Sequence, residues 1–341
     1  MPDSRIPPPS APSGRPPGLW RKLTRQAWWP WLKRGATTVF LGLVCYLLVS
    51  QARAIEWDKV LSSLQNYPLS ASWGAVALAA ASYLLYSCFD LLGRHYTGHT
   101  LRAATVMTIT FVSYAFTLNL GSPVGAVAFR YRLYSRLGLA MGTITRVMSF
   151  SILANWMGYL LLAGLVFSLR PPALPDSWRI DASQLRLIGL LLLALALAYL
   201  GACAFSRQRS FSLRGHGIEL PSLRLAGLQI GMGVANWLLM SGILFVLLQH
   251  RIDFFSVASV LLLAAVAGLI THIPGNLGVL EAVFVALLSH RMPQHELLAG
   301  LVAYRVIYYL VPLLIASVIY LLMEAKAKKM AQAQDTPAVR S

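Results

Sequence analysis

Glu281 and Arg305 are the residues whose type and place first suggest chemistry, because both stand within or beside apolar runs. Arg305 lies in the run 298–323, and Glu281 directly follows a Pro/Gly break at 274–278. A charged side chain at membrane depth is costly and marks a functional site by default. We therefore predict that the two residues pair. Two interpretations are open: a substrate-binding site, or a structural link between the two segments.

Two Pro/Gly breaks interrupt apolar runs and are the second candidate for a binding site. The run 105–120 ends in GSPVG at 121–125, and the run 254–272 ends in PGNLG at 274–278. A helix that restarts inside a membrane turns free N–H groups and the positive end of its dipole toward the membrane centre. With restarts expected at Ala126 and Val279, the sequence predicts a site for an anion such as a phosphate. The alternative is that both breaks are packing kinks.

The predicted substrate-binding residues flank these breaks or lie in the last apolar run. Arg130 follows the first break much as Glu281 follows the second, although it also begins a basic stretch that reaches Arg146. His272 directly precedes the second break, where a hydrogen bond to loop backbone is favoured over a proton relay. The full predicted set is Asn119, Pro123, Gly125, Arg130, His272, Pro274, Gly275, Asn276, Gly278, Glu281, Arg305 and Tyr309.

Residue patterns that serve enzymes or metals are not found in the sequence. It shows no Ser/His/Asp set, zinc motif, paired carboxylates or phosphate loop, so no enzyme activity, cofactor or metal is predicted. His95 and His99 have an i, i+4 spacing but lack a third ligand. Asp90 and Arg94 have the same spacing, and we interpret them as a helical ion pair.

The composition places the chain in a membrane. Of its 341 residues 57% are hydrophobic and 12% are charged, about half the charged share usual in soluble domains. A net charge of +17 would suggest nucleic acid as the partner of a soluble protein. Here the positive-inside rule accounts for the basic residues, so nucleic acid is not a predicted partner.

Apolar runs long enough to cross the ~30 Å hydrocarbon layer occur at 35–55, 73–92, 147–169, 187–205, 225–248 and 298–323. Because the basic stretch 130–146 belongs on the cytoplasmic side, the runs 105–120 and 254–272 are predicted to turn back as re-entrant hairpins, at about 105–134 and 254–288. Both termini are then cytoplasmic. The predicted fold class is all-α integral membrane, with six full spans and two re-entrant helical hairpins.

The order span, span, hairpin, span occurs twice, and three crossings make the second copy an inverted repeat. We divide the chain into a tail at 1–34, a first repeat at 35–169, a second repeat at 170–324 and a basic cytoplasmic tail at 325–341. The first tail begins with a segment predicted to be disordered. It ends in interleaved Trp, Arg and Lys, which favour the lipid headgroup layer.

Several motifs together resemble the integral-membrane family of the lysylphosphatidylglycerol synthase/flippase membrane domain. They are HIPGNLGVLEA at 272–282, AYRVIYY at 303–309 followed by Pro312, FDLL at 89–92, FRYRLYSRLGL at 129–139 and NWMGY at 155–159. In bifunctional members the membrane domain is thought to move aminoacylated phosphatidylglycerol between leaflets, and a separate soluble domain makes it. The family's usual Pro-Gly-Gly at the second break reads Pro-Gly-Asn here. Because Asn tolerates a positive φ, we expect the turn to survive.

The resemblance implies a stand-alone, translocase-type module of the bacterial inner membrane, without the synthase activity. We predict a lipid translocase that handles an anionic or aminoacylated phospholipid, so the predicted partners are phospholipid and membrane. The alternative function is a non-transporting scaffold or regulator of envelope phospholipid homeostasis. Envelope protein partners and a homo-oligomer are left open.

Overall fold

The computed structural model describes Ser62 and residues 68–172, 174, 181–206, 210–213, 216–271 and 273–335. All of them belong to the compact unit Ile55–Ser341. The predicted span 35–55 and the aromatic and basic segment that precedes it lie outside the described residues. His272 and the segment 336–341 also lie outside them.

The described part is built from long apolar helices. They are α4 (Leu69–Ser87) with its continuation α5 (Phe89–Thr97), α6 (Ala103–Leu120), α8 (Met141–Leu169), α9 (Ala182–Phe205), α10 (Leu223–Leu247), α11 (Phe254–Thr271), and α13 (Gln294–Tyr304) continued by η3 (Arg305–Leu310) and α14 (Val311–Asp335). Seven helices of the described residues are long and apolar enough to cross a membrane. Each predicted span that falls on described residues is therefore confirmed as a long apolar helix.

Short elements complete the described structure. They are η1 (Pro123–Phe129), α7 (Arg130–Arg136), η2 (Pro274–Asn276), α12 (Val279–Leu288), and the antiparallel strands β1 (Ser210–Leu213) and β2 (His216–Glu219). The strands form a small ribbon between α9 and α10. Apart from this ribbon, the described structure is helical, as the sequence predicts.

Both predicted breaks are present, and glycine conformations explain them. α6 ends where Gly121 takes a φ of 86°. At the second break Gly275, Asn276 and Gly278 have φ values of 65°, 50° and 75°. These left-handed conformations end a helix at low cost in glycine, and asparagine tolerates them better than most residues. The turn predicted to survive at Asn276 is thus confirmed.

The helix after the first break starts earlier than the sequence predicts. η1 begins at Pro123 with Ser122 as its N-cap, not at Ala126. Proline suits the first helical position because its missing N–H would have no partner there and its φ is already helical. The helix after the second break begins at Val279, as predicted.

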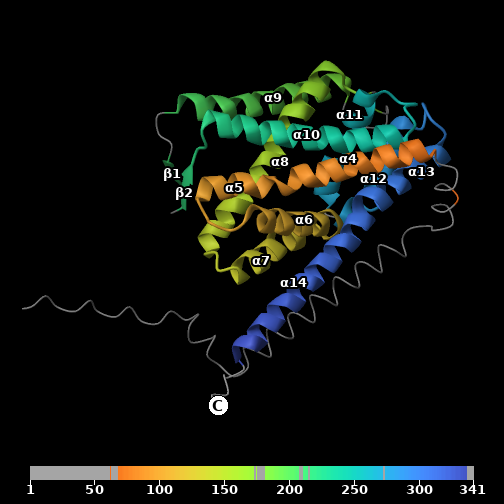
Figure 1. Cartoon of the computed structure of the whole chain (residues 1–341). Coiled ribbons are helices and arrows are strands. Elements are labelled where there is room, and N and C mark those ends of the chain that lie inside the picture. Colours follow the sequence, from red (N-terminus) through yellow and green to blue (C-terminus); the bar gives the residue numbers. More distant parts are fainter. Residues whose placement is uncertain are drawn as a thin grey trace, which may run out of the picture. The chain divides into compact units, whose positions relative to one another are not determined.

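The two broken segments form helical hairpins at opposite ends of the helix bundle. α6 packs against η1 and α7, and α11 packs against α12. Figure 1 shows the end of α5, the ribbon β1–β2 and α7 at the left end of the bundle, and α12 and α13 at the right end. This arrangement agrees with the predicted entry of the two hairpins from opposite sides. Re-entry into a bilayer and the inverted repeat stay predictions.

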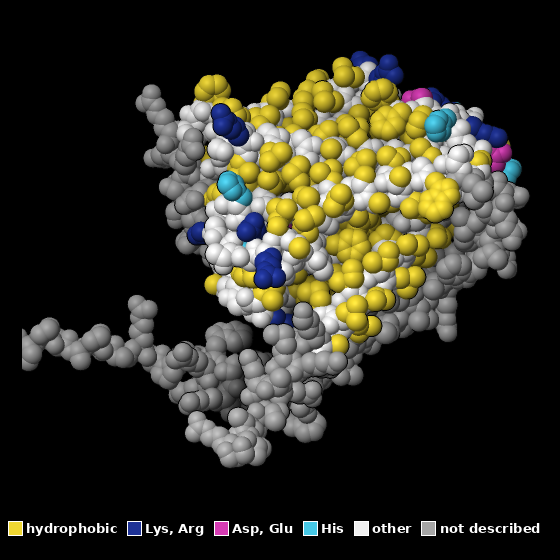
Figure 2. Space-filling model, in the orientation of Figure 1, with side chains coloured by type: hydrophobic (Ala, Val, Ile, Leu, Met, Phe, Trp, Pro, Cys, Tyr) yellow, Lys and Arg dark blue, Asp and Glu magenta, His cyan; other side chains and the backbone are white. Residues whose placement is uncertain are grey.

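The surface shows where the bundle meets lipid. A broad band of hydrophobic side chains covers the middle of the view in Figure 2, and charged side chains gather at its two ends. The left end shows Lys, Arg and His, whereas the right end also shows Asp and Glu. Because cytoplasmic loops carry an excess of Lys and Arg, the left end is the predicted cytoplasmic end.

Glycines allow the closest helix contacts in the bundle. A Cβ atom on Gly158 of α8 would overlap the main chain of Gly233 of α10. A Cβ atom on Gly125 would overlap the main chain of Thr117 of α6 in the same way. Small residues let membrane helices approach until their backbones touch. Gly125 therefore allows the two arms of the first hairpin to come into backbone contact.

Candidate functional site

The predicted pair between Glu281 and Arg305 is confirmed. Arg305 Nε and Nη2 both donate to the Glu281 carboxylate, with an Nη2 to Oε2 distance of 2.9 Å. The Arg305 side chain is 6% exposed and that of Glu281 is 19% exposed. A bidentate arginine–carboxylate pair is both strong and specific in geometry. It joins the second hairpin to the last long helix.

Arg305 also closes the second break itself. Its Nη1 donates to the carbonyl oxygen of Gly275 at 2.9 Å, and its Nη2 donates to that of Asn276 at 2.7 Å. A guanidinium has five N–H donors, and four of them donate to Glu281, Gly275 and Asn276. Arg305 is thus a positioning residue for the break. The predicted role of Arg305 as a phosphate ligand becomes secondary to this structural one.

A second buried ion pair joins Asp90 of α5 to Arg130 of α7. Arg130 Nη2 lies 3.1 Å from Asp90 Oδ1, and the two side chains are 1% and 0% exposed. Tyr134 donates to Asp90 Oδ2 at 2.8 Å, and Ser151 donates to Oδ1. The predicted helical pair of Asp90 with Arg94 is therefore wrong. The first hairpin brings a better-buried partner to this carboxylate, which sequence spacing does not reveal.

Asn119 links the end of α6 to η3. Its Nδ2 donates to the carbonyl oxygens of Ala115 at 2.8 Å and Tyr309 at 3.2 Å. The wide turns of a π-helix displace main-chain hydrogen bonds and are frequent at functional sites. In η3, Asn119 supplies a donor to Tyr309, and the Tyr83 hydroxyl supplies one to the carbonyl of Tyr308 at 3.0 Å. α6 also packs against η2, so the two breaks are neighbours.

Six buried tyrosines lie between the two ion pairs, and we call them the tyrosine cluster: Tyr83, Tyr86, Tyr114, Tyr304, Tyr308 and Tyr309. The Tyr114 and Tyr308 hydroxyls lie 2.8 Å apart, and Ser82 is hydrogen-bonded to Tyr308 and Asn236 at 2.7 Å each. Of the six, only Tyr309 is among the site residues predicted from the sequence. The others stand in apolar runs, where a buried tyrosine is hard to distinguish from a packing residue.

The tyrosine cluster connects the ion pairs without a gap. Tyr86 interacts with Arg130 and stacks on Tyr114 at 3.5 Å between ring centroids. Tyr308 stacks on Tyr304 at 5.4 Å, and the Arg305 guanidinium lies 5.4 Å from the Tyr309 ring centroid. Hydroxyl hydrogen bonds and ring stacks together form a chain of tyrosines, which we call the polar path, from Asp90 and Arg130 to Arg305 and Glu281. Polar side chains are costly to place in a membrane interior, so a chain of them marks a functional site by default.

Glycines and prolines at the breaks take different parts. The N–H of Gly125 is bonded to the carbonyl of Gly121 at 3.0 Å, and the space beside its Cα is filled by Thr117. Gly125 is therefore a packing residue, and the expectation of an open anion cradle at this position is not met. Gly278 has open space around it and caps α12 without a side-chain hydrogen bond. Pro123 and Pro274 begin η1 and η2.

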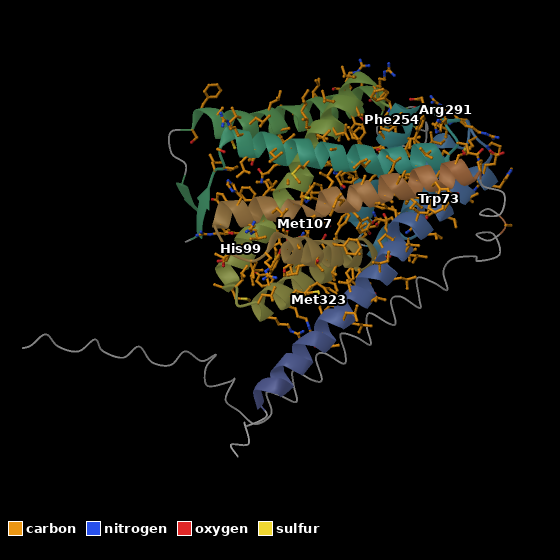
Figure 3. The ribbon with its side chains drawn as sticks, viewed as in Figure 1. Trp73, His99, Met107, Phe254, Arg291 and Met323 are labelled. Atoms are coloured by element: carbon orange, nitrogen blue, oxygen red, sulfur yellow. The ribbon has the colours of Figure 1, made fainter. Side chains whose placement is uncertain are left out.

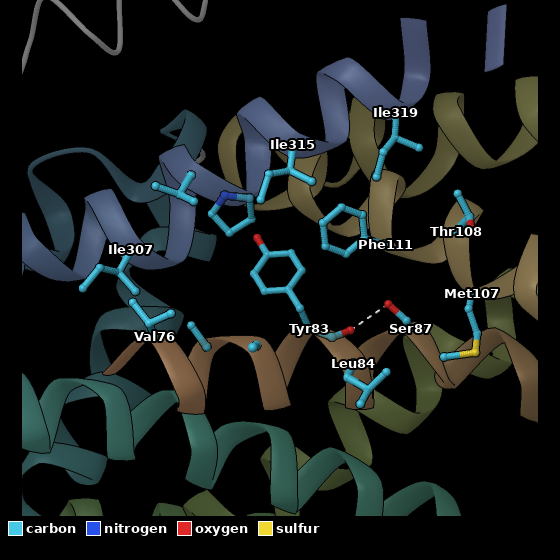
Figure 4. Close-up of a pocket in the computed structure, with 14 residues that line it drawn as sticks. Val76, Tyr83, Leu84, Ser87, Met107, Thr108, Phe111, Ile307, Ile315 and Ile319 are labelled. Carbon is cyan, nitrogen blue, oxygen red and sulfur yellow. Dashed lines mark hydrogen bonds between the residues drawn. The ribbon is translucent and has the colours of Figure 1, made fainter. Parts of the chain in front are cut away.

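An apolar groove runs along the face beside this path. Its volume is about 500 Å³, and its walls come from α4, α6, η3 and α14. The hydroxyls of Ser87 and Thr108 donate to their own helices, at 2.7 and 2.8 Å, so they offer the groove no free donor. Tyr83 lines the groove (Figure 4). Its hydroxyl donates to the carbonyl oxygen of Tyr308 at 3.0 Å.

Comparison with known proteins places the chain in a family. A family model described as the lysylphosphatidylglycerol synthase TM region matches residues 35–316. The chain belongs to this lysylphosphatidylglycerol synthase membrane-region family. The match includes both breaks, both ion pairs and the whole tyrosine cluster. The resemblance seen in the sequence is thereby confirmed.

Three relatives set the family membership in context. The chain is 44% identical over 303 residues to the inner membrane protein YbhN of Escherichia coli, covering 89% of this chain and 95% of that protein. It is 33% identical over 267 residues to the uncharacterized protein slr0712 of Synechocystis, covering 77% and 83%. It is also 33% identical over 88 residues to the phosphatidylglycerol lysyltransferase of Staphylococcus haemolyticus, covering 25% and 10%.

These comparisons and the long apolar helices settle the location. The family, the similarity to an inner membrane protein and the seven apolar helices identify a multi-pass protein of the bacterial inner membrane. Family membership also links the chain to phospholipids in a general way. Among the described residues there is no group of three or more His, Cys, Asp or Glu suited to a metal ion.

Proposed function

We propose that this chain is a membrane-embedded translocase for an anionic or aminoacylated phospholipid. The headgroup follows the polar path between the two ion pairs, and an acyl chain stays in the apolar groove. The helix start at the second break and the residues around it, including Asn276 and Gly278, are the proposed headgroup contacts. The proposal assigns no catalysis and no cofactor to the chain.

The observation that carries the proposal is the pairing of path and groove on either side of Tyr83. Its ring lines the groove, and its hydroxyl bonds to Tyr308 within the tyrosine cluster. A phospholipid that crosses a membrane needs a polar route for its headgroup and a lipid-like route for its chains. Polar groups buried close to hydrocarbon are costly. A core that only held the helices together would therefore be expected to be apolar.

A second candidate function is a non-transporting scaffold that binds lipid through the same groove. The observation that favours it is the dense hydrogen bonding of Arg305, whose donors are largely taken by Glu281, Gly275 and Asn276. A set of groups bonded so fully resists movement. The two functions share binding of lipid and differ in headgroup movement across the bilayer.

Headgroup movement in vesicles tests the proposal. The purified chain is reconstituted with fluorescent phosphatidylglycerol, and dithionite measures how fast headgroups reach the outer leaflet. We expect faster movement than in protein-free vesicles. Ala80→Trp fills the groove and should abolish it, whereas Ala77→Trp, on an exposed part of the same helix outside the groove, should not. Bound lipid without any movement would favour the scaffold.

A further inference from the structure

Unpartnered nitrogen atoms gather at the basic end of the bundle. Arg94 Nε, both ring nitrogens of His99 and Arg130 Nε are buried and make no hydrogen bond, and Arg130 Nη2 has only its ion pair with Asp90. The described part of the chain gives them one carboxylate, Asp90, which pairs with Arg130 and already accepts from Tyr134 and Ser151. Buried polar groups are nearly always hydrogen-bonded, so a cluster of exceptions calls for a missing acceptor.

These side chains converge from two elements and the loop between α5 and α6. Arg94 lies one helical turn beyond Asp90 on α5, and His99 is close enough to both for their charges to act on it. The His99 ring lies 6.4 Å from that of Tyr134, which bonds to Asp90. Figure 3 shows His99 at the left end of the bundle. The cluster therefore sits where a lipid headgroup of the predicted cytoplasmic leaflet would lie.

The charge of the cluster specifies the missing partner. Burial and the positive charge of Arg94 lower the pKa of His99 from its usual 6.5, which favours the neutral ring at pH 7. Two arginines and one aspartate leave a net charge of +1. A group with a single negative charge and several acceptor oxygens balances it, and a phosphodiester has both properties. Arginine suits phosphate oxygens because its donors form a planar fork.

We propose that Arg94, His99 and Arg130 form a binding site for a phosphodiester group at the basic end of the bundle. Arg130, 1% exposed, provides the buried charge at the floor of the site, and Arg94 and His99 provide its rim. The site differs from the two helix breaks and stands at the start of the polar path. It deepens the proposed translocation by naming where the headgroup phosphate first binds, and in that respect it rests on that function.

Binding to the purified full chain tests this site apart from transport. Native mass spectrometry measures the retention of dioleoylphosphatidylglycerol, with dioleoylglycerol as the probe that lacks a phosphate. Arg94→Gln and His99→Ala change half-exposed rim residues, so the fold should persist, which a thermal melt confirms. We expect each to weaken phosphatidylglycerol binding about tenfold, as loss of one charge-assisted hydrogen bond does. Diacylglycerol binding should not change.

Matched controls come from the same segment. Arg102→Gln and His95→Ala alter exposed residues of the same two types and should leave affinity within about twofold of wild type. Millimolar inorganic phosphate that raises the melting temperature of wild type but not of Arg94→Gln would assign the site to free phosphate if lipid retention is the same in both. Lipid retention and phosphate response that match wild type in both rim variants would overturn the site and leave water as its occupant.

Binding and movement separate this inference from the proposed function. A wild-type chain that binds phosphatidylglycerol through Arg94 and His99 but moves no headgroups keeps the phosphodiester site and contradicts translocation. A chain that moves headgroups equally well with Arg94→Gln and His99→Ala, and binds lipid equally well, keeps translocation and contradicts the site.

Discussion

Asn119 donates from its side chain to the main-chain carbonyl of Tyr309, 190 residues further along the chain, at 3.2 Å. This one bond joins the end of α6, at the first break, to η3, whose Arg305 holds the second break. The two breaks are thus linked through hydrogen bonds from the side chains of Asn119 and Arg305 to main-chain carbonyls. A displacement of one break would therefore be transmitted to the other through Asn119.

Asn119→Leu should loosen this coupling. The variant removes the donor and leaves the Tyr309 carbonyl buried without it, which costs about 1–3 kcal/mol. We expect a lower melting temperature in detergent and faster hydrogen exchange in η3. Asn155→Leu, on a half-exposed part of α8, is the matched control and should melt near wild type. Equal melting of both variants would show that the bond to Tyr309 contributes nothing.

The Glu281–Arg305 pair should respond asymmetrically to mutation. Removing one member of a buried ion pair costs ~3–5 kcal/mol because the other charge stays unpaired. Arg305→Gln also strips two donors from the Gly275 and Asn276 carbonyls, so it should melt lower than Glu281→Gln. The double variant should recover only part of the loss. Thermal melts of all four proteins measure this, and full recovery in the double variant would contradict the role of Arg305 at the break.

Asp90 and Arg94 should behave as residues with separate roles. Asp90→Asn leaves the buried charge of Arg130 without its carboxylate, so we expect a loss of ~3–5 kcal/mol in stability. Arg94→Gln leaves that pair intact and should lower stability by less than about 1 kcal/mol. The interpretation of Asp90 and Arg94 as an ion pair predicts similar losses for both variants. Chemical or thermal denaturation of the two proteins distinguishes these outcomes.

Substitutions of the glycines at the two breaks should destabilise the protein for different reasons. Gly125→Ala places a Cβ onto the main chain of Thr117, so it should prevent the hairpin from closing and reduce the yield of folded protein. Gly278→Ala meets open space but carries a positive φ, so a cost of about 1 kcal/mol is expected. Gly142→Ala, in open space within α8, should be neutral or stabilising. If Gly125→Ala matched wild type in yield and melting temperature, the two arms of the hairpin must be able to move apart enough to admit the Cβ atom.

Accessibility to a membrane-impermeant maleimide tests the threading. In a background with Cys45, Cys88 and Cys203 replaced, Ser135→Cys and Gly142→Cys should react only after cells are opened. Ser289→Cys and Gln294→Cys should react from outside. All four positions are exposed in the structure, so protection reports the side of the membrane and not burial. Labelling of position 135 or 142 in intact spheroplasts would contradict the re-entrant first hairpin.

The sequence by itself determined the parts of this protein that depend on local composition. Long apolar runs specify helices, because a backbone in hydrocarbon must satisfy its own hydrogen bonds. Pro/Gly pentapeptides specify where the helices break. The partner of Glu281 was also predictable, since few charges lie deep in the apolar runs and each needs an opposite one.

Only the tertiary structure decided which polar groups meet across helices. Asp90 has an arginine four residues away on its own helix, yet it pairs with Arg130 because the first hairpin returns α7 to α5. The sequence predicts that Gly125 contributes to an anion site, yet its contact with Thr117 makes it a packing residue. Tyr83, Tyr86 and Tyr114 read as apolar packing, yet they connect two ion pairs. Such contacts depend on how the helices pack side by side. The periodicity and composition of one helix do not indicate which helices lie next to it.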